Sequence, residues 1–225
     1  MKRSRVNGIL REGEAFIRSF GFALPPFANW RPDELSRLRP EGIVGARLGW
    51  DITDYGQERF DELGLFLFTV RNGRAQDLAQ GRGMLYAEKI MISRRDQLSP
   101  MHRHVMKAED IINRGGGTLV VELYASDPDG GIDSEAKVSV PTDGVVRTLP
   151  AGGRLALGPG ESVTLMPGVW HAFWGEGGDV LIGEVSTVND DLTDNVFAEP
   201  IGRFSSIEED EAPYRLLVSD YDGFT

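Results

Sequence analysis

The sequence of 225 residues contains no cysteine and only three histidines. Without cysteine the chain has no disulfides, no thiol nucleophile and no thiolate ligands, so a metal site must use nitrogen and oxygen donors. No apolar run approaches the ~18 residues that a membrane-spanning helix needs. The basic start, residues 1–5, is not followed by the continuous apolar stretch of a secretory signal. We therefore expect a cytoplasmic enzyme or binding protein.

Basic residues are also scarce relative to acidic ones: 24 lysines and arginines stand against 35 aspartates and glutamates, and the net charge is −11. Such a chain is a poor partner for nucleic acid or for an anionic membrane surface, and neither is expected. The acidic run at residues 208–211 is predicted to be a solvated surface stretch. The length and a hydrophobic content of 40% are typical of one domain with a substantial core.

Apolar residues at helical spacing predict an amphipathic helix near the start of the chain. The pattern runs from Val6 to Phe20, and Gly21 stands where a C-terminal cap is expected. Pro25-Pro26 prevents its continuation, and Pro32 suits the first turn of a second, short helix. The N-terminal part is therefore predicted to be helical.

After these helices the chain changes to short apolar runs separated by Gly, Asp, Asn and Pro, which is typical of strands and turns. Asp143-Gly144 lies between two of the runs and is a hairpin signal. Many short strands with few helices predict an all-β-dominated sandwich or barrel. The predicted strands are 65–70, 84–92, 118–124, 137–140, 145–149, 162–166 and 180–185.

All three histidines occur where a shared metal site is possible. His102 and His104 are two residues apart, and on a strand such residues point to the same face. Glu109 follows, where a turn would bring it back, and His171 lies beside another predicted turn. An isolated His-x-His pair is often without function, but the glycines at 115–117 indicate a sharp turn of the backbone close by. This set of nitrogen and oxygen donors suits Mn, Fe, Ni, Co or Zn.

These residues resemble the two cupin motifs. The positions whose spacing matches are His102, His104, Glu109 and Gly116 for the first motif, and Gly160, Gly168 and His171 for the second. Over nearly its full length the chain is also similar to the D-lyxose isomerase family of sugar-isomerising cupins. The segments that carry this similarity are 24–28, 48–54, 64–69, 86–91, 109–117 and 183–191.

The resemblance implies a single cupin domain over residues 1–225. Its parts would be an N-terminal helical and irregular extension (1–60), a jelly-roll β-barrel core (61–190) and a C-terminal extension (191–225). The expected cofactor is one divalent ion, Mn²⁺ by preference, held by His102, His104, Glu109 and His171. The resemblance further implies a homodimer that interconverts D-lyxose with D-xylulose and, in many members, D-mannose with D-fructose.

Such an isomerisation needs a base that moves a proton between neighbouring carbons, and the three histidines are already assigned to the metal. The candidate carboxylates are Glu88, Glu184 and Glu199. We favour Glu199, with Glu184 as a second catalytic carboxylate, because Glu199 lies between apolar residues four positions before Arg203. Lys107 is expected to steady the enediolate oxygen.

Contacts to the sugar are further expected from Lys89, Glu88, Asp190 and Arg203. Two other functions remain open on the sequence. One is a different cupin metalloenzyme, such as an iron oxygenase with the same ligand set. The other is a non-catalytic cupin that binds sugar and metal without changing the ratio of aldose to ketose.

Overall fold

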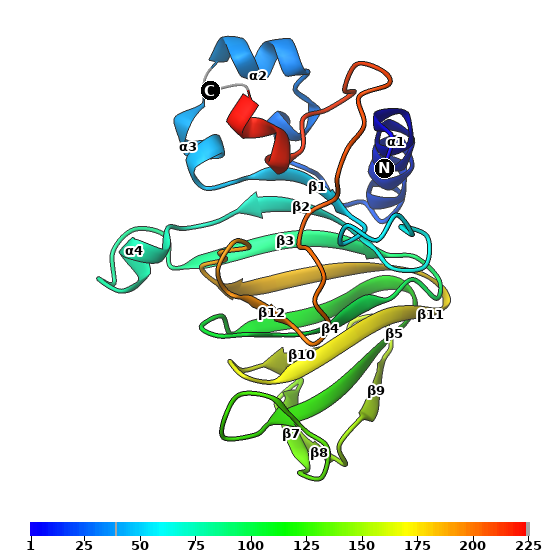
Figure 1. Cartoon of the computed structure of the whole chain (residues 1–225), viewed down its shortest axis with the longest axis vertical. Coiled ribbons are helices and arrows are strands. Elements are labelled where there is room, and N and C mark those ends of the chain that lie inside the picture. Colours follow the sequence, from blue (N-terminus) through cyan, green and yellow to red (C-terminus); the bar gives the residue numbers. More distant parts are fainter. Residues whose placement is uncertain (39, 224–225) are drawn as a thin grey trace.

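The computed structural model describes residues 1–38 and 40–223, and strands dominate it (Figure 1). The helical elements are α1 (Arg3–Ser19), η1 (Pro26–Asn29), α2 (Pro32–Leu38), α3 (Glu41–Gly45), α4 (Ala75–Leu78) and η2 (Val218–Gly223), where η denotes a 3₁₀ helix. Within the described ranges no helix combines the length and the apolar character needed to cross a membrane.

The strands are β1 (Gly49–Thr53), β2 (Leu65–Arg71), β3 (Tyr86–Ser93), β4 (Ser99–His104), β5 (Glu109–Ser126), β6 (Ile132–Asp133), β7 (Val138–Thr142), β8 (Val145–Leu149), β9 (Gly153–Leu157), β10 (Ser162–Leu165), β11 (Trp170–Thr187) and β12 (Asn195–Phe197). The predicted all-β-dominated fold with a helical N-terminal part is confirmed. Each predicted strand is present, although 118–124 and 180–185 are only parts of the long β5 and β11. By contrast, β1, β4, β6, β9 and β12 have no counterpart among the predicted strands, although the spacing of His102 and His104 allowed for an extended segment at β4.

The two longest strands, β5 and β11, pair antiparallel along most of their length and are shared by both halves of a curled sheet. In one half, the segment of β11 from Val180 to Thr187 pairs with β3, which continues through β2 to β1. In the other half, His171 and Phe173 of β11 pair with β4, which pairs with β12. On the other side, β9 and β10 pair with β5. The sheet thereby curls into the barrel-like sandwich seen in Figure 1.

Both long strands bend where glycines are concentrated. The register of β11 against β5 shifts between Glu176 and Val180, next to Gly116. A Cβ on Gly116, whose φ is 100°, would lie 2.1 Å from the backbone oxygen of Asp179, so the close approach of the strands excludes a side chain there. The sharp turn predicted at residues 115–117 is therefore wrong: it is a bend within one continuous strand, because pairing with β11 resumes on both sides.

The half of the sheet formed by β1, β2 and β3 is buried on both faces, which explains the unbroken apolar run of β2. Leu65 and Leu67 belong to the core inside the barrel. Phe66 and Phe68 point the other way and pack against α1, which lies over this face (Figure 1). The α1 residues buried there are Val6, Ile9, Leu10 and Ile17. Burial of one amphipathic face thus holds the helix in place.

Local signals in the sequence are confirmed at several chain reversals. Phe20 forms the C-terminal cap of α1, and Gly21 follows with a φ of 72°. α2 begins at Pro32. Asp143 and Gly144 have φ values of 49° and 84°, the left-handed pair that a tight hairpin between β7 and β8 requires.

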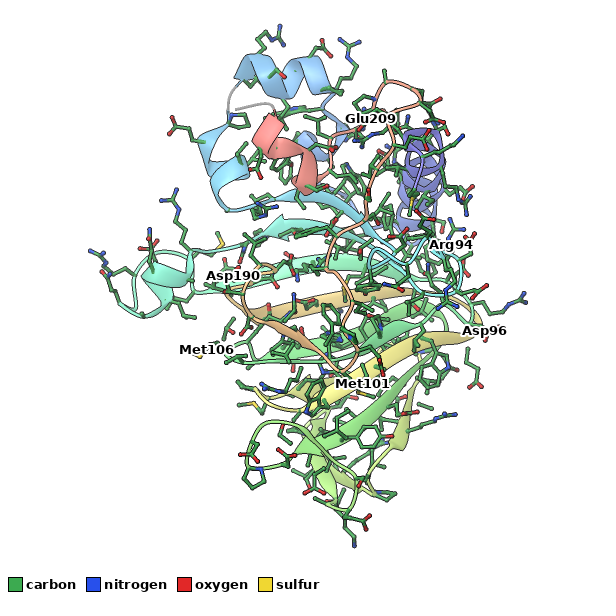
Figure 2. All side chains as sticks on the ribbon, viewed as in Figure 1. Arg94, Asp96, Met101, Met106, Asp190 and Glu209 are labelled. Carbon is green, nitrogen blue, oxygen red and sulfur yellow. The ribbon has the colours of Figure 1, made fainter. Side chains whose placement is uncertain are left out.

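The acidic run at residues 208–211 is exposed, and it lies against the start of α1, where Glu209 is seen (Figure 2). Asp210 accepts hydrogen bonds from the backbone nitrogen and the hydroxyl of Ser4 at 2.8 and 2.7 Å. The first N–H groups of a helix have no partner within the helix, so this carboxylate from the far end of the chain caps it. The predicted solvated surface stretch is therefore confirmed, and its carboxylates additionally contact the start of α1.

Arg3 tests how much this attachment contributes to stability. Its guanidinium is 2% exposed and donates to the carboxylates of Glu209 and Asp220. Arg3→Ala leaves Asp220, which is 14% exposed, without its partner, and we expect the free energy of unfolding to fall by about 3 kcal/mol. The matched control, Arg5→Ala, removes an exposed ion pair with Asp61 and should cost less than about 1 kcal/mol. Urea unfolding of both full-length variants measures the difference, and equal losses would contradict this role of Arg3.

Candidate active site

The three histidines converge on one point inside the barrel. His102 and His104 extend from β4, and His171 on β11 lies directly opposite His102 in the sheet register. Their ligand nitrogens all lie within 4.8 Å of one another. Nδ1 of His102 is 2.8 Å from the carbonyl oxygen of Pro100, and Nδ1 of His171 is 3.0 Å from that of Val169. A carbonyl only accepts hydrogen bonds, so both Nδ1 atoms carry the proton and leave Nε2 as the ligand atom.

Glu109, the first residue of β5, brings a carboxylate to the same point. Its Oε1 atom lies 3.3 Å from Nε2 of His104 and 3.3 Å from Nε2 of His171. Nε2 of His171 is buried and has no hydrogen-bond partner in the described part of the chain. A buried polar atom without a partner is costly, and a cation between these donors would satisfy it. The three imidazoles therefore form a group that could hold one metal ion, and the Glu109 carboxylate lies beside two of them.

The protonation states of these groups suit metal binding. Burial, together with the neighbouring His171 and His104, lowers the pKa of His102 well below its usual value. Burial and the nearby Lys107 ammonium likewise lower the pKa of His104. Burial alone would raise the pKa of Glu109, but the Lys107 ammonium outweighs it and the pKa stays well below normal. These directions favour neutral imidazoles at His102 and His104 and an ionised carboxylate at Glu109, as metal ligands must be.

A chain of buried charges runs from Glu109 along the wall of a cavity inside the barrel. Nζ of Lys107 is 2.6 Å from Oε2 of Glu109 and 3.1 Å from Oε1 of Glu184. Nζ of Lys89 approaches the same Glu184 oxygen at 3.3 Å and donates to Asn189 at 2.7 Å. Burial would lower the pKa of Lys107, but Glu109 and Glu184 raise it above its usual value. Glu184 is therefore a buried carboxylate held between two lysines.

A second group of charges surrounds Arg203 in the same cavity. Its Nη2 atom is 2.9 Å from Oδ2 of Asp51 and 3.3 Å from Oδ2 of Asp191, and its Nη1 atom is buried without a hydrogen-bond partner among the described residues. The hydroxyls of Tyr55 and Ser99 also line the cavity and are 3.0 Å apart. Burial raises the pKa of Tyr55 to about 12, so this hydroxyl keeps its proton. Such a wall of hydroxyl and N–H groups suits a ligand that carries several hydroxyls.

Four of the predicted catalytic and substrate-binding residues line this cavity: Lys89, Lys107, Glu184 and Arg203. Glu88 does not line it. It precedes Lys89 on β3, and because successive residues of a strand point to opposite faces, it projects outward and pairs with Arg71 at 2.9 Å.

Asp190 and Glu199 also lie outside the cavity wall. The carboxylate of Asp190 accepts hydrogen bonds from Leu192 N at 3.0 Å and from the hydroxyl of Thr193 at 2.7 Å, and so shapes a turn in the loop between β11 and β12 (Figure 2). Glu199 is exposed, and Arg203 pairs with other carboxylates. A pairing between residues four apart needs a helical turn, whereas residues 198–217 form no helix.

The prediction from sequence missed two acidic residues of the site, Asp191 and Asp51. Asp191 follows the predicted Asp190 directly; burial would raise its pKa, but Arg203 and Lys89 hold it low. Asp51 lies within the fully buried strand β1, and burial raises its pKa. A carboxylate inside an apolar strand is a signal of function, but β1 was not recognised as a strand.

Fold and site together define the class of the protein: a cupin, whose barrel carries three histidines that could hold a metal ion. The structure of Cellulomonas parahominis L-ribose isomerase with L-psicose has a TM-score of 0.62 at 16% identity and covers 92% of this chain and 98% of that one. Acinetobacter sp. DL28 L-ribose isomerase in complex with L-ribose has a TM-score of 0.61 at 15% identity, with the same coverage. At these identities the likeness concerns the fold alone.

Sequence relatives are much closer. A protein from Serratia proteamaculans named D-lyxose/D-mannose isomerase is 49% identical over 226 residues, which cover 98% of both chains. One of the same name from Escherichia coli O157:H7 is 44% identical over 229 residues and covers 100% of both. The family model for D-lyxose isomerase matches residues 1–221. The chain therefore belongs to the D-lyxose isomerase family, and the resemblance inferred from the sequence is confirmed.

The histidine cluster can be tested by removing one member. We expect His171→Ala to lose most of the bound divalent ion, because Nε2 of His171 faces Glu109 and has no other partner in the described chain. Glu88→Gln is the control and should keep the ion, since Glu88 lies on the outer face of β3. Metal content after dialysis, measured by elemental analysis, compares the two variants with the unmodified protein.

Removal of the ion should also lower the melting temperature of the unmodified protein. A ligand that binds only the folded state stabilises it by about 2.7 kcal/mol at a hundredfold excess over its dissociation constant. An unchanged melting curve after confirmed removal, or full metal content in His171→Ala, would contradict the assignment.

Proposed function

We propose that the protein is a metal-dependent aldose–ketose isomerase that interconverts D-lyxose with D-xylulose and D-mannose with D-fructose. The observation that carries the proposal is Glu184, a buried carboxylate that lines the cavity. It is connected through Lys107 to Glu109, one of the candidate metal ligands. The family to which the chain belongs, and the names of its relatives, support the choice of sugars.

We propose His102, His104, Glu109 and His171 as the ligands of one divalent ion, with Mn²⁺ as the ion in accordance with the family resemblance. When bound, such an ion supplies an electrophile for the two oxygens between which the carbonyl group moves. The donor set also accepts Fe, Co, Ni or Zn, and Mn²⁺ stands at the weak end of the affinity order, so occupancy depends on metal supply.

Glu184 is proposed as the base. The sequence alone had favoured Glu199 for this role. Its carboxylate takes the proton from C2 of the open-chain aldose and returns it to C1, while the hydroxyl proton of O2 passes to O1. The product is the ketose, and no atom is gained or lost. The Lys107 ammonium donates a hydrogen bond to the oxygen on which negative charge develops in the enediolate. Lys89 and Arg203 hold sugar hydroxyls, and the unpaired Nη1 of Arg203 supports this role.

A single incubation tests the function. The Mn²⁺-loaded protein is mixed with D-lyxose under an oxygen-free atmosphere, and D-xylulose is measured by chromatography. We expect the two sugars to reach the same ratio from either side. An unchanged ratio with sugar bound would identify a non-catalytic binding protein, and turnover that requires oxygen would identify an oxygenase.

The base can be tested by two matched substitutions. Glu184→Gln should keep its metal but lose activity by on the order of 10²–10⁴, because the amide cannot accept the C2 proton. Glu199→Gln makes the same chemical change at an exposed position and should leave activity near that of the unmodified enzyme. Exchange of the C2 hydrogen with solvent deuterium is followed by NMR. Normal exchange in Glu184→Gln, or its loss in Glu199→Gln, would move the role elsewhere.

We also propose that residues 1–225 act as one domain. Both predicted extensions contribute strands to the sheet, because β1 pairs with β2 and β12 pairs with β4. Both also contribute to the charged end of the site, since Asp51 comes from the N-terminal extension and Arg203 from the C-terminal one. This mutual dependence supports a unit that folds as a whole.

A cytoplasmic homodimer is proposed as the working form. The family resemblance supports it, and so do apolar side chains on β8: Val145 and Val146 are 64% and 66% exposed. Sedimentation velocity at micromolar concentration should give twice the chain mass of 24.8 kDa. A monomeric mass under these conditions would exclude the dimer.

A further inference from the structure

The loop at residues 105–108, which joins β4 to β5, carries Lys107 into the cavity although the residues before it have little apolar anchorage. Val105 and Met106 are 48% and 72% exposed, and Met106 projects from the surface (Figure 2). Lys107 is 3% exposed and lies between Glu109 and Glu184. Burial of apolar side chains at 105 and 106 therefore does not account for the position of the loop.

Asp194, in the loop between β11 and β12, supplies the missing anchorage. Its Oδ1 atom accepts hydrogen bonds from the backbone nitrogens of Val105 and Met106 at 3.0 and 2.7 Å, and its Oδ2 atom accepts one from that of Lys107 at 3.0 Å. Oδ2 also lies 3.8 Å from Nδ1 of His104, which is buried and has no hydrogen-bond partner within the described chain. One buried carboxylate thus faces three consecutive amides and a metal-ligand imidazole.

We propose that Asp194 is a positioning residue for both Lys107 and His104. By holding three consecutive N–H groups it fixes the backbone of the loop, so that Nζ of Lys107 reaches Glu109 and Glu184. Its carboxylate also lies 3.8 Å from Nδ1 of His104, where its negative charge favours the proton on that nitrogen and leaves Nε2 facing Glu109. Ligating imidazoles are commonly oriented by a carboxylate on their second nitrogen. The consequence for catalysis rests on the function proposed above, whereas the consequence for metal binding does not.

The position requires a side chain with two accepting oxygens because the three backbone amides that face it are donors. An asparagine of the same shape has one oxygen and one NH₂ group, so it would set its own donors against N–H groups of the loop or against His104. Asp194→Asn changes the shape of the side chain very little. It therefore tests the acceptance of hydrogen bonds by the second carboxylate oxygen and not the volume of the side chain. Asp133→Asn is the matched control: Oδ1 of Asp133 accepts two backbone N–H groups, of Glu135 and Ala136, in a loop that does not contribute to the cavity.

The test compares the two full-length variants with the unmodified protein. The dissociation constant for Mn²⁺ is measured by competition with a chelator, and we expect Asp194→Asn to bind the ion about 10- to 100-fold more weakly. The absorption bands of the Co²⁺-substituted form should shift, because the orientation of one ligand changes. Under saturating metal, kcat should fall by at least about tenfold while KM changes less than about threefold, since Lys107 acts on the developing charge. Asp133→Asn should match the unmodified protein in all three measurements.

An unchanged metal affinity together with an unchanged Co²⁺ spectrum in Asp194→Asn would overturn the proposal. A second measurement does not depend on a variant that folds: hydrogen exchange of the Met106 amide in the unmodified protein. Met106 is exposed and its amide donates to the Asp194 carboxylate, so we expect this amide to be protected from exchange only if the carboxylate holds it. Exchange at unprotected rates would overturn the proposal. If the unmodified protein shows no isomerase activity, the proposed function is refuted. The effect of Asp194→Asn on the affinity for Mn²⁺ does not depend on that outcome.

Discussion

The pairing of the bent strands β5 and β11 is the constraint on which the rest of the structure depends. Thirteen residues separate His171 from Glu184 on β11, and in a straight strand they would lie about 40 Å apart. Yet Oε1 of Glu109 contacts His171, and Lys107 bridges Glu109 to Glu184. The bend near Gly116 brings the two ends of β11 to one interior. Glycine permits this bend because the backbones approach so closely there that a side chain would not fit. Without the bend, His171 and Glu184 would lie too far apart to contribute to one site.

The interior that results contains more charge than a hydrophobic core tolerates without compensation. An isolated buried ion costs several kcal/mol, so each carboxylate of the cavity is placed against a cation. Glu184 is shared by Lys89 and Lys107, and Arg203 joins Asp51 to Asp191. Replacing such pairs with apolar side chains is often neutral or stabilising, so their presence is better explained by chemistry than by stability. Nε2 of His171 and Nη1 of Arg203 are among the buried atoms that have no hydrogen-bond partner in the described residues, and a ligand at these two atoms would complete the network.

One loop, residues 188–194, connects these charges to one another. Asn189 accepts a hydrogen bond from Lys89, Asp191 lies between Lys89 and Arg203, and Asp194 holds the backbone beside Lys107. The loop has little apolar material of its own, and Leu192 is 63% exposed. The loop is held by polar contacts to the same residues that it positions. The loop and the site therefore become ordered together.

The sequence by itself determined those features that depend on neighbours along the chain. His102 and His104 share a face because a strand repeats every two residues, and Asp143-Gly144 makes a hairpin because both residues accept a positive φ. The candidate metal ligands could also be identified from the sequence, because their spacing along the chain matches that of the two cupin motifs.

Only the tertiary structure decided which carboxylates face the cavity. Glu88 shares a strand face with Ile90 and Ile92, and Glu184 shares one with Val180 and Ile182, so the sequence pattern places both on an apolar face. The sheet is apolar on both sides because α1 covers its outer face, and polarity therefore cannot distinguish inside from outside. Glu184 projects into the barrel and Glu88 away from it, and this difference follows from the packing of α1 against β2 and β3, which no local pattern in the sequence contains.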